Sequence, residues 1–388
     1  MRRFIPILVI SIMNVSAALA DVASSDQAPS LRSELSRWTS AAETEATKFD
    51  GIRRHDGATI GRGSVLLRGA KGDRVRKLSE RLVEEGALSP QAVGSVLDER
   101  IESALVAWQE RNGLTPDGKA GDEAVEILDR QPDEAAANLR AAAKEMEAFS
   151  SGAVPDDVVI VNLASQQLLL VRGGRIVLSM RTAVGRPSRP TPAMNDRIVG
   201  VVFNPTWTVP PTVMKKDKLP SLQRRGTPGI SGAAIYVDGE LVDPKDVDWK
   251  GVSPGRIRIV QAPGDHNALG RIKFELTNGD NIYMHDTNDH SVFGRTNRMV
   301  SSGCVRLADP MALAVAALSP QGWDEGRIRK AIDARSTARV GLSSPLPVRL
   351  VYWTAALGAD GAVSPARDAY GRNRIRSASM ETTDGSPR

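Results

Sequence analysis

The spacing of apolar residues changes along this 388-residue chain near Pro155, and that change limits the folds it can adopt. Before Pro155, apolar residues recur at the spacing of a helix face. After it, short apolar runs separated by Gly and Pro turns predict strands. The predicted strands are residues 158–163, 167–171, 175–181, 198–203, 256–260, 272–276 and 281–285. We therefore expect an α+β multidomain protein, in which a small three-helix domain precedes a mainly-β sandwich domain.

The first 20 residues have the composition of a secretory signal peptide. Arg2 and Arg3 precede an apolar run from Phe4 to Met13, and the small residues at 18–20 follow it. The run is well below the about 20 apolar residues that cross a bilayer. We expect export to the periplasm and no integral membrane segment after signal cleavage.

Three stretches within residues 59–131 have apolar residues at helical spacing, which predicts a compact helical domain. These residues are Val75, Leu78 and Leu82; Ile101, Ala104, Leu105 and Trp108; and Val125 and Leu128. The polar residues 21–58 are predicted to be a linker with one short helix on the stripe Leu31, Leu35 and Trp38. Residues 132–150, rich in Ala and Glu, are predicted to be a connecting helix.

The strand-rich domain is expected over residues 151–335. Between about 206 and 255 its strand pattern gives way to basic, Pro-rich and Gly-rich stretches, which we interpret as an inserted cap over a cleft. Residues 336–388 are rich in Ser, Ala, Arg and Gly, and we predict a mostly disordered basic tail in which residues 348–353 could form one strand.

The charge distribution argues against a nucleic-acid partner. The chain has a net charge of +5 and a pI near 9.4. Residues 1–20 carry +2, and residues 336–388 carry +3 from seven Arg and four acidic residues, which leaves residues 21–335 neutral. No basic domain is present to follow phosphates.

The only cysteine, Cys304, follows Ser302 and Gly303 and precedes Arg306 by two positions, and His285 lies nineteen residues upstream. A lone thiol with a histidine and an arginine is typical of a nucleophilic cysteine site, and Gly303 allows a substrate carbonyl to approach the backbone. The alternatives are a cysteine buried in the core and a zinc site. Zinc-ligand spacing is only weakly matched by His285, Asp289, His290 and Cys304. A papain-like protease is disfavoured, because its catalytic Cys comes before its His, the opposite of the order in this chain.

These residues resemble the active-site signature of the L,D-transpeptidases, whose YkuD-type catalytic domain has a histidine before a Ser/Thr-X-Gly-Cys-X-Arg/Asn segment. Residues 186–192, 204–210 and 267–274 are similar to stretches of the large Gram-negative branch, whose members carry an inserted cap. Ser302 replaces the second histidine that many smaller members have. Residues 107–121 resemble a peptidoglycan-binding domain.

The resemblance implies roles for seven residues. Cys304 would be the nucleophile and His285 the general base and acid, while Gly303 would act as a backbone oxyanion donor or orient the loop. Tyr283 would contact the oxyanion or the substrate, or be a core aromatic. Arg306, Trp207 and Ser302 would bind substrate; for Arg306 an internal salt bridge, and for Trp207 a core position, are the alternatives. No metal or cofactor is implied.

The family also implies an activity. Cys304 would attack the bond between meso-diaminopimelate and D-Ala in a donor stem peptide, and an acceptor amine would resolve the thioester. An L,D-carboxypeptidase that uses water, and a catalytically dead wall-binding protein, are the alternatives. Expected partners are peptidoglycan stem peptides and glycan, and carbapenems are expected to acylate Cys304. A stem peptide, a lipoprotein lysine, a D-amino acid and water all remain open as acceptors, as do the oligomeric state and regulators.

Overall fold

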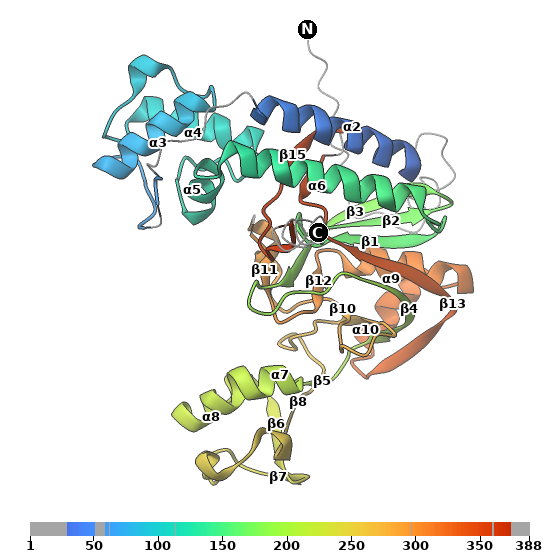
Figure 1. The fold of residues 1–388 in the computed structure, drawn as a ribbon. Helices are drawn as coiled ribbons and strands as arrows, with labels where there is room; N and C mark the ends of the chain where they lie inside the picture. The colour runs from blue at the N-terminus through green and yellow to red at the C-terminus, as the bar shows by residue number, and fades with distance from the viewer. Residues whose placement is uncertain are drawn as a thin grey trace, which may run out of the picture.

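The computed structural model describes residues 29–50, 59–61, 63–112, 114–295, 297–358 and 361–373. The predicted signal peptide lies outside these ranges. Helices form one end of the molecule, a large sheet lies in the middle, and a small separate unit projects from the other end (Figure 1). Within the described residues, no helix has the length and apolar character needed to cross a membrane.

The predicted three-helix domain is present. It consists of α3 (Asp73–Glu84), a 3-10 turn (Pro90–Ala92), α4 (Glu99–Arg111) and α5 (Asp122–Leu128). The Asp98 carboxylate caps α4 by accepting from the N–H groups of Arg100 and Ile101. Leu78, Leu105 and Trp108 are completely buried in a core that belongs to this domain alone.

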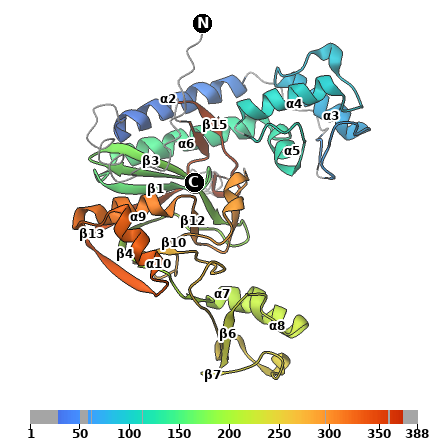
Figure 2. The ribbon, with the colours of Figure 1, turned by 180° about the vertical axis from the view of Figure 1, so that it is seen from behind.

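Two long helices lie against the outer face of the main sheet, α2 (Leu31–Asp50) and α6 (Pro132–Ser151) (Figures 1 and 2). They run antiparallel, because Arg32 donates to the Ser150 carbonyl at one end and Arg140 pairs with Asp50 at the other. The apolar stripe predicted for α2 is buried between α6 and the sheet. Residues 31–50 are therefore not linker with a short helix: alanines complete the stripe and allow close helix packing.

The main sheet has nine strands in the order β11-β3-β12-β10-β9-β4-β13-β1-β2, and β3 also pairs with β2, so the ladder closes on itself. The strands are β1 (Val158–Asn162), β2 (Gln167–Arg172), β3 (Arg175–Gly185), β4 (Met194–Phe203), β9 (Ile272–Glu275), β10 (Met284–His285), β11 (Met299–Ser301), β12 (Val305–Leu307) and β13 (Ala338–Val351). The fold class is thus confirmed as α+β with a sheet-rich domain. The closed ladder is barrel-like, because β3 is long enough to pair along both edges.

The sheet encloses α9 (Pro310–Leu318), and α10 (Glu325–Asp333) follows it. Helix α9 is apolar on all sides, as expected for a helix buried in a core. Strand β1 is buried on both faces: Val159 and Val161 face the inner core, whereas Val158 and Ile160 pack under α2 and α6.

The prediction of a mostly disordered tail is wrong for the described residues after 336. Strand β13 lies inside the sheet, parallel to β1 and antiparallel to β4. Beyond it, β14 (Ala355–Leu357) pairs with β15 (Val363–Pro365). The less buried Pro347, Arg349 and Val351 alternate with the buried Leu346, Val348 and Leu350, and Ser, Gly and Arg occupy much of the strand before them. The composition therefore resembled a disordered segment although one face of the strand is core.

The insertion forms its own small unit with a four-stranded sheet in the order β5-β8-β6-β7. Its elements are β5 (Trp207–Thr208), α7 (Pro211–Val213), a π-helical turn (Met214–Lys218), α8 (Leu219–Arg225), β6 (Ala233–Val237), β7 (Glu240–Leu241), 3-10 turns at Trp249–Gly251 and Pro254–Arg256, and β8 (Ile257–Gln261). Strand β8 pairs with β5 and β6 rather than with the main sheet, so the cap extends past residue 255. Leu222, Trp249 and Ile259 form its core.

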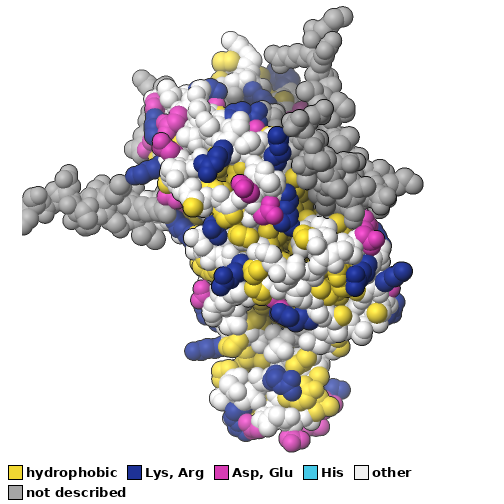
Figure 3. Space-filling model, turned by 90° about the vertical axis from the view of Figure 1, so that its right-hand side faces the viewer, with side chains coloured by type: hydrophobic (Ala, Val, Ile, Leu, Met, Phe, Trp, Pro, Cys, Tyr) yellow, Lys and Arg dark blue, Asp and Glu magenta, His cyan; other side chains and the backbone are white. Residues whose placement is uncertain are grey.

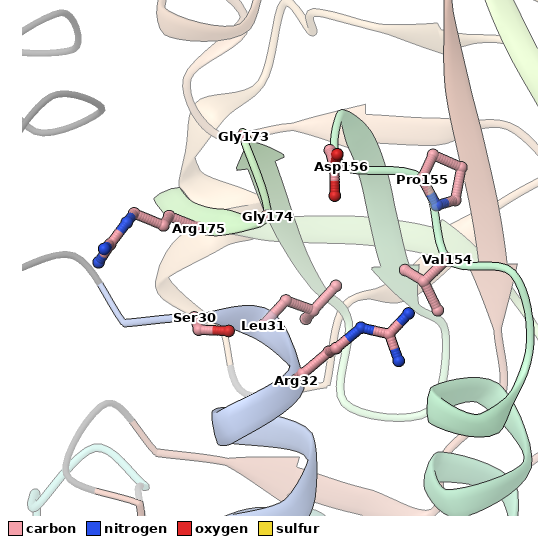
Figure 4. A pocket seen from close by; sticks show the side chains of 9 residues that line it. All are labelled: Ser30, Leu31, Arg32, Val154, Pro155, Asp156, Gly173, Gly174 and Arg175. Atoms are coloured by element: carbon pink, nitrogen blue, oxygen red, sulfur yellow. The ribbon is translucent and has the colours of Figure 1, made fainter.

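A hollow lies where the N-terminus of α2 meets the turn between β2 and β3 (Figure 4). The Leu31 N–H donates to the Gly174 carbonyl there, and the Ile176 N–H donates to the Pro29 carbonyl. The hollow is lined by Arg32, Arg175 and Asp156 among others, and contains no thiol or imidazole. On the face in Figure 3, Lys and Arg side chains lie among Asp and Glu side chains.

Candidate active site

The segment from Ser301 to Cys304 is a tight turn between β11 and β12. The Ser301 hydroxyl donates to the Cys304 carbonyl (2.6 Å) and accepts from the Gly303 N–H (3.1 Å). Gly303 has φ +129°, a conformation that favours glycine, and a Cβ there would approach Ile282. The sequence Ser-Ser-Gly-Cys therefore makes its own turn, and the thiol comes directly before a strand.

Hydrogen bonds hold both backbone polar groups of Gly303. Its N–H donates to Ser301, and its carbonyl accepts from the hydroxyl of the fully buried Thr191 (2.7 Å). The N–H predicted to be an oxyanion donor thus already donates to the Ser301 hydroxyl, which favours the alternative that Gly303 orients the loop. Among the described residues, the Cys304 N–H has no backbone partner.

The Cys304 thiol is in contact with Tyr283. The thiol lies 3.8 Å from the Asn281 carbonyl oxygen, and the Tyr283 hydroxyl favours its thiolate form. Burial raises the pKa of the thiol, and the bonds to Tyr283 and the charges of Lys273 and Arg306 oppose that rise. Burial and the charge of Cys304 raise the pKa of the Tyr283 hydroxyl, and Trp207 opposes that rise.

His285 is buried on β10, and its orientation is fixed by its own neighbour. Its Nδ1 is 2.5 Å from the Asp286 carbonyl oxygen, a bond that puts the proton on Nδ1 and leaves Nε2 free to accept one. No hydrogen bond joins His285 to Cys304 in the described residues, and the centre of the Tyr283 ring is 5.6 Å from that of the imidazole. The Asp286 carboxylate instead holds the N–H groups of Arg271 and Thr287.

Two cations flank His285 in the register of the sheet. Lys273 on β9 and Arg306 on β12 are its cross-strand partners, so the three side chains share one face. The Lys273 ammonium also lies 4.6 Å from the centre of the Tyr283 ring. Burial, Arg306 and Lys273 lower the pKa of His285 to about 3. The imidazole is therefore neutral near pH 7 and can accept a proton.

Arg306 makes no salt bridge among the described residues, which does not support the alternative of an internal ion pair. Its Nε is buried without a hydrogen-bond partner. Burial lowers its pKa, and Asp289 and Cys304 act on it only through charge. A buried guanidinium with an unpartnered donor is suited to receive an anionic group.

Two known domain families match parts of this chain. The model of the L,D-transpeptidase catalytic domain, YkuD, matches residues 156–328, and that of a peptidoglycan binding domain matches residues 71–128. Residues 156–328 form a YkuD-type L,D-transpeptidase domain. The match ends before β13, which nevertheless lies between β4 and β1 in the sheet of the YkuD domain.

A curated relative from Haemophilus influenzae, named for the L,D-transpeptidases, is 36% identical over 230 residues. The alignment covers 57% of this chain and 46% of the relative, so the chain spans about half the length of that protein. Among solved structures, the L,D-transpeptidase of Xylanimonas cellulosilytica is 14% identical with a TM-score of 0.24, covering 75% of this chain and 99% of the other. L,D-transpeptidase 3 of Mycobacterium tuberculosis is 14% identical with a TM-score of 0.26, covering 51% and 61%. These scores are too low to support conclusions about this chain.

The predicted site residues of the YkuD domain come together in two groups. Cys304, Tyr283 and Trp207 form one group, in which Cys304 and Trp207 both act on the pKa of Tyr283, and it reaches from the Ser301–Cys304 turn to the first cap strand. His285 and Arg306 lie side by side on β10 and β12. Ser302 is exposed, and its hydroxyl accepts from Arg186 and Arg189.

Four residues near Cys304 or the turn before it were not among the predicted site residues: Lys273, Thr191, Arg186 and Arg189. Lys273 is placed by strand register, which the alternation of β9 alone does not reveal. The other three lie in the loop between β3 and β4, more than 110 positions before Cys304. Two signals pointed to this loop: its four basic and polar residues among prolines, and the similarity of residues 186–192 to the large Gram-negative branch. In the described part of the chain, no group of three or more His, Cys, Asp or Glu could hold a metal.

Proposed function

We propose that this chain is a cysteine-dependent L,D-transpeptidase of the bacterial cell wall. The observation that carries the proposal is the neutral, oriented His285 beside Arg306, with Cys304 held at the adjacent strand start in contact with Tyr283. A soft nucleophile, a base and an anion-binding group thus meet within the YkuD domain.

The chemistry has two steps. His285 takes the thiol proton, and the Cys304 sulfur attacks the carbonyl carbon between meso-diaminopimelate and D-Ala. The carbon–nitrogen bond breaks, His285 returns the proton to the departing D-Ala amine, and a thioester remains on Cys304. An acceptor amine then attacks the thioester carbonyl carbon and gives its proton to His285. The carbon–sulfur bond breaks, and His285 returns that proton to the departing Cys304 thiolate, which leaves a new amide and the free thiol.

The site supplies donors where charge develops. The unpartnered Cys304 N–H and the Tyr283 hydroxyl are the groups available for the carbonyl oxygen in the tetrahedral intermediate. Arg306 is the candidate for a substrate carboxylate because its buried Nε lacks a partner. Trp207 and Ser302 would contact the substrate at the cap side and at the nucleophile turn.

The remaining proposals follow from the domains. The helical domain over residues 71–128 would bind peptidoglycan and keep the enzyme on its substrate. Stem peptides and glycan would be the partners, and the periplasm the location. We propose that an amine, rather than water, resolves the thioester on Cys304. The two reactions give different products, so identifying the product tests the proposal.

The first prediction concerns the nucleophile. Cys304→Ala should lose all activity and keep its fold, since the chain has no other thiol. Intact-protein mass spectrometry should show one adduct on the wild type with a donor tetrapeptide or a carbapenem, and none on the variant. Circular dichroism provides the folding control. An adduct on Cys304→Ala would place the nucleophile elsewhere.

Muropeptide analysis after incubation with intact sacculi separates the alternatives. Cross-linked products or D-amino-acid exchange support transfer to an amine, whereas tripeptides alone indicate a carboxypeptidase. Neither product, from folded protein, would indicate a wall-binding protein without activity.

A further inference from the structure

The loop between β3 and β4 brings two guanidinium groups to the nucleophile turn. Arg186 Nη2 and Arg189 Nη1 each lie 3.1 Å from the hydroxyl oxygen of Ser302, two residues before Cys304. The Arg186 backbone N–H also donates to the Ser301 carbonyl (3.1 Å). This loop is therefore attached to the turn by both backbone and side chains, and its two charges are held at Ser302, two residues before Cys304.

One carboxylate already occupies this place. Asp217, in the π-helical turn of the cap, accepts from Arg189 through both oxygens, at 2.6 and 2.7 Å. The distance from Asp217 Oδ2 to Arg186 Nη2 is longer, at 3.5 Å. Arg189 lowers the pKa of Asp217, so the carboxylate is ionised. The two arginines thus form a site whose shape and charge suit a carboxylate. The bidentate ion pair of Arg189 with Asp217 joins the cap to the loop between β3 and β4.

The charges do not balance. Asp217 offsets Arg189, whose side chain is 11% exposed, but Arg186 is 38% exposed, and in the described part of the chain its only other side-chain bond is to the neutral Ser302. A guanidinium has five N–H donors, so Arg186 keeps donors for another acceptor. One positive charge therefore remains at Ser302, two residues before Cys304, on the side that faces Asp217 of the cap.

We propose that Arg186 binds a free carboxylate of the peptide substrate, and that the Arg189–Asp217 ion pair fixes the wall of this subsite. The inference is built on the proposed function, since it concerns the substrate of the Cys304 site. The ligand class is a peptide or amino-acid carboxylate, which either the donor stem peptide or the acceptor could supply.

The test compares free with amidated substrates. Donor tetrapeptides amidated at D-Glu, at the meso-diaminopimelate side chain, or at the terminal D-Ala are compared with the free peptide for kcat/KM of thioester formation. A free D-amino acid and its amide are compared in resolving the thioester. The wild type is expected to lose about 10-fold to 100-fold with one amidated form, the range of a charge-assisted hydrogen bond. The form affected identifies donor or acceptor.

Arg186→Gln should lower kcat/KM for the free substrate by the same factor and abolish the preference for free over amidated substrate. Arg186→Lys should restore part of the preference, because it keeps the charge and loses the fork. Arg197→Gln, at an exposed arginine on β4, is the matched control. The ratio of free to amidated rates does not depend on the folded fraction, so partial unfolding cannot imitate the effect.

The inference is overturned if the wild type has no preference, or if Arg186→Gln keeps it unchanged. Failure of the proposed function has a different signature, an adduct or turnover in Cys304→Ala. Adducts that require Cys304, together with a preference that ignores Arg186, would reject the subsite alone.

Discussion

At the scale of single residues, the state of His285 is set by neighbours on adjacent strands. Lys273 and Arg306 flank the imidazole, and the Asp286 carbonyl holds Nδ1. Two cations and burial disfavour the imidazolium, so the ring remains a base in the folded protein. The same cations favour the Cys304 thiolate, although burial outweighs them.

The pH dependence of acylation follows from this arrangement. Since the pKa of His285 is lowered to about 3 from 6.5, kcat/KM should stay flat between about pH 5 and 7, where an ordinary histidine would give an acid limb. His285→Ala should lose about 100-fold or more at pH 7 and gain rate with rising pH, as the thiolate forms unaided. A flat profile in the variant would remove His285 from the base role.

The same pKa shift acts on stability. The unfolded chain takes up a proton on His285 below about pH 6.5, and the folded chain does so only near pH 3, so stability falls as the pH drops through this window. His285→Ala should therefore show a weaker loss of stability between pH 6.5 and pH 3 in urea unfolding.

Gly270 determines where the Asp286 side chain lies. Its φ is +61°, and a Cβ at this position would overlap the Asp286 carboxylate, which in turn holds the N–H groups of Arg271 and Thr287. We predict that Gly270→Ala costs about 1–3 kcal/mol and also lowers acylation, because Asp286 carries the carbonyl that orients His285. Gly279→Ala, with open space around its Cβ, is the control. If Gly270→Ala and Gly279→Ala changed thermal stability and the acylation rate equally, the link from Gly270 through Asp286 to His285 would be refuted.

At the scale of elements, the C-terminal segment after β13 supports the turn from Ser301 to Cys304. The Tyr370 hydroxyl donates to the Gly185 carbonyl at the end of β3 (2.5 Å) and accepts from the Thr191 N–H (3.4 Å). The Thr191 hydroxyl bonds to the Gly303 carbonyl. Tyr370 is thus connected to the turn that carries Cys304 by hydrogen bonds through the buried Thr191.

Tyr370→Phe should therefore slow acylation by about tenfold through loss of positioning, with KM unchanged. The expected loss of stability is about 1–2 kcal/mol, and the ring stacked on Tyr352 is kept. Tyr236→Phe is the control, because the Tyr236 hydroxyl has no hydrogen bond among the described residues. Thermal unfolding and single-turnover acylation provide the readouts. A change in stability with unaltered acylation would make Tyr370 purely structural.

At the scale of the whole molecule, the helical domain is separable from the helices that support the sheet. It has its own core, whereas α2 and α6, which precede and follow it, pack on β1 and β2. Because α2 ends near Arg140 of α6, a short Gly/Ser linker can join Asp50 to Pro132. The deletion keeps the helix pair and removes two contacts to the C-terminal segment, Arg130 to the Pro365 carbonyl and Glu126 to Arg367.

We predict that this deletion weakens sedimentation with sacculi while a soluble donor tetrapeptide is still acylated onto Cys304. The reason is that the domain raises local substrate concentration and contributes no residue to the site. Full-length Cys304→Ala should still sediment, which separates binding from catalysis. Unchanged sedimentation after deletion would make the domain a spacer.

The sequence by itself determined the elements whose signals are local. Helical periodicity identified α3, α4 and α5, and the motifs around His285 and Cys304 identified the family. Strand patterns located β1, β2 and β4, because alternating or continuous burial leaves a pattern within one segment.

Only the tertiary structure decided which distant segments meet. The register that puts Lys273 and Arg306 beside His285, the insertion of β13 between β4 and β1, and the reach of Arg186 to Ser302 each depend on pairing across long stretches of chain. Local composition misjudged β13, because a strand with one polar face resembles a disordered segment until its partners are known. Pairing free energy comes from contacts between segments, so it leaves no trace in the pattern of either segment alone.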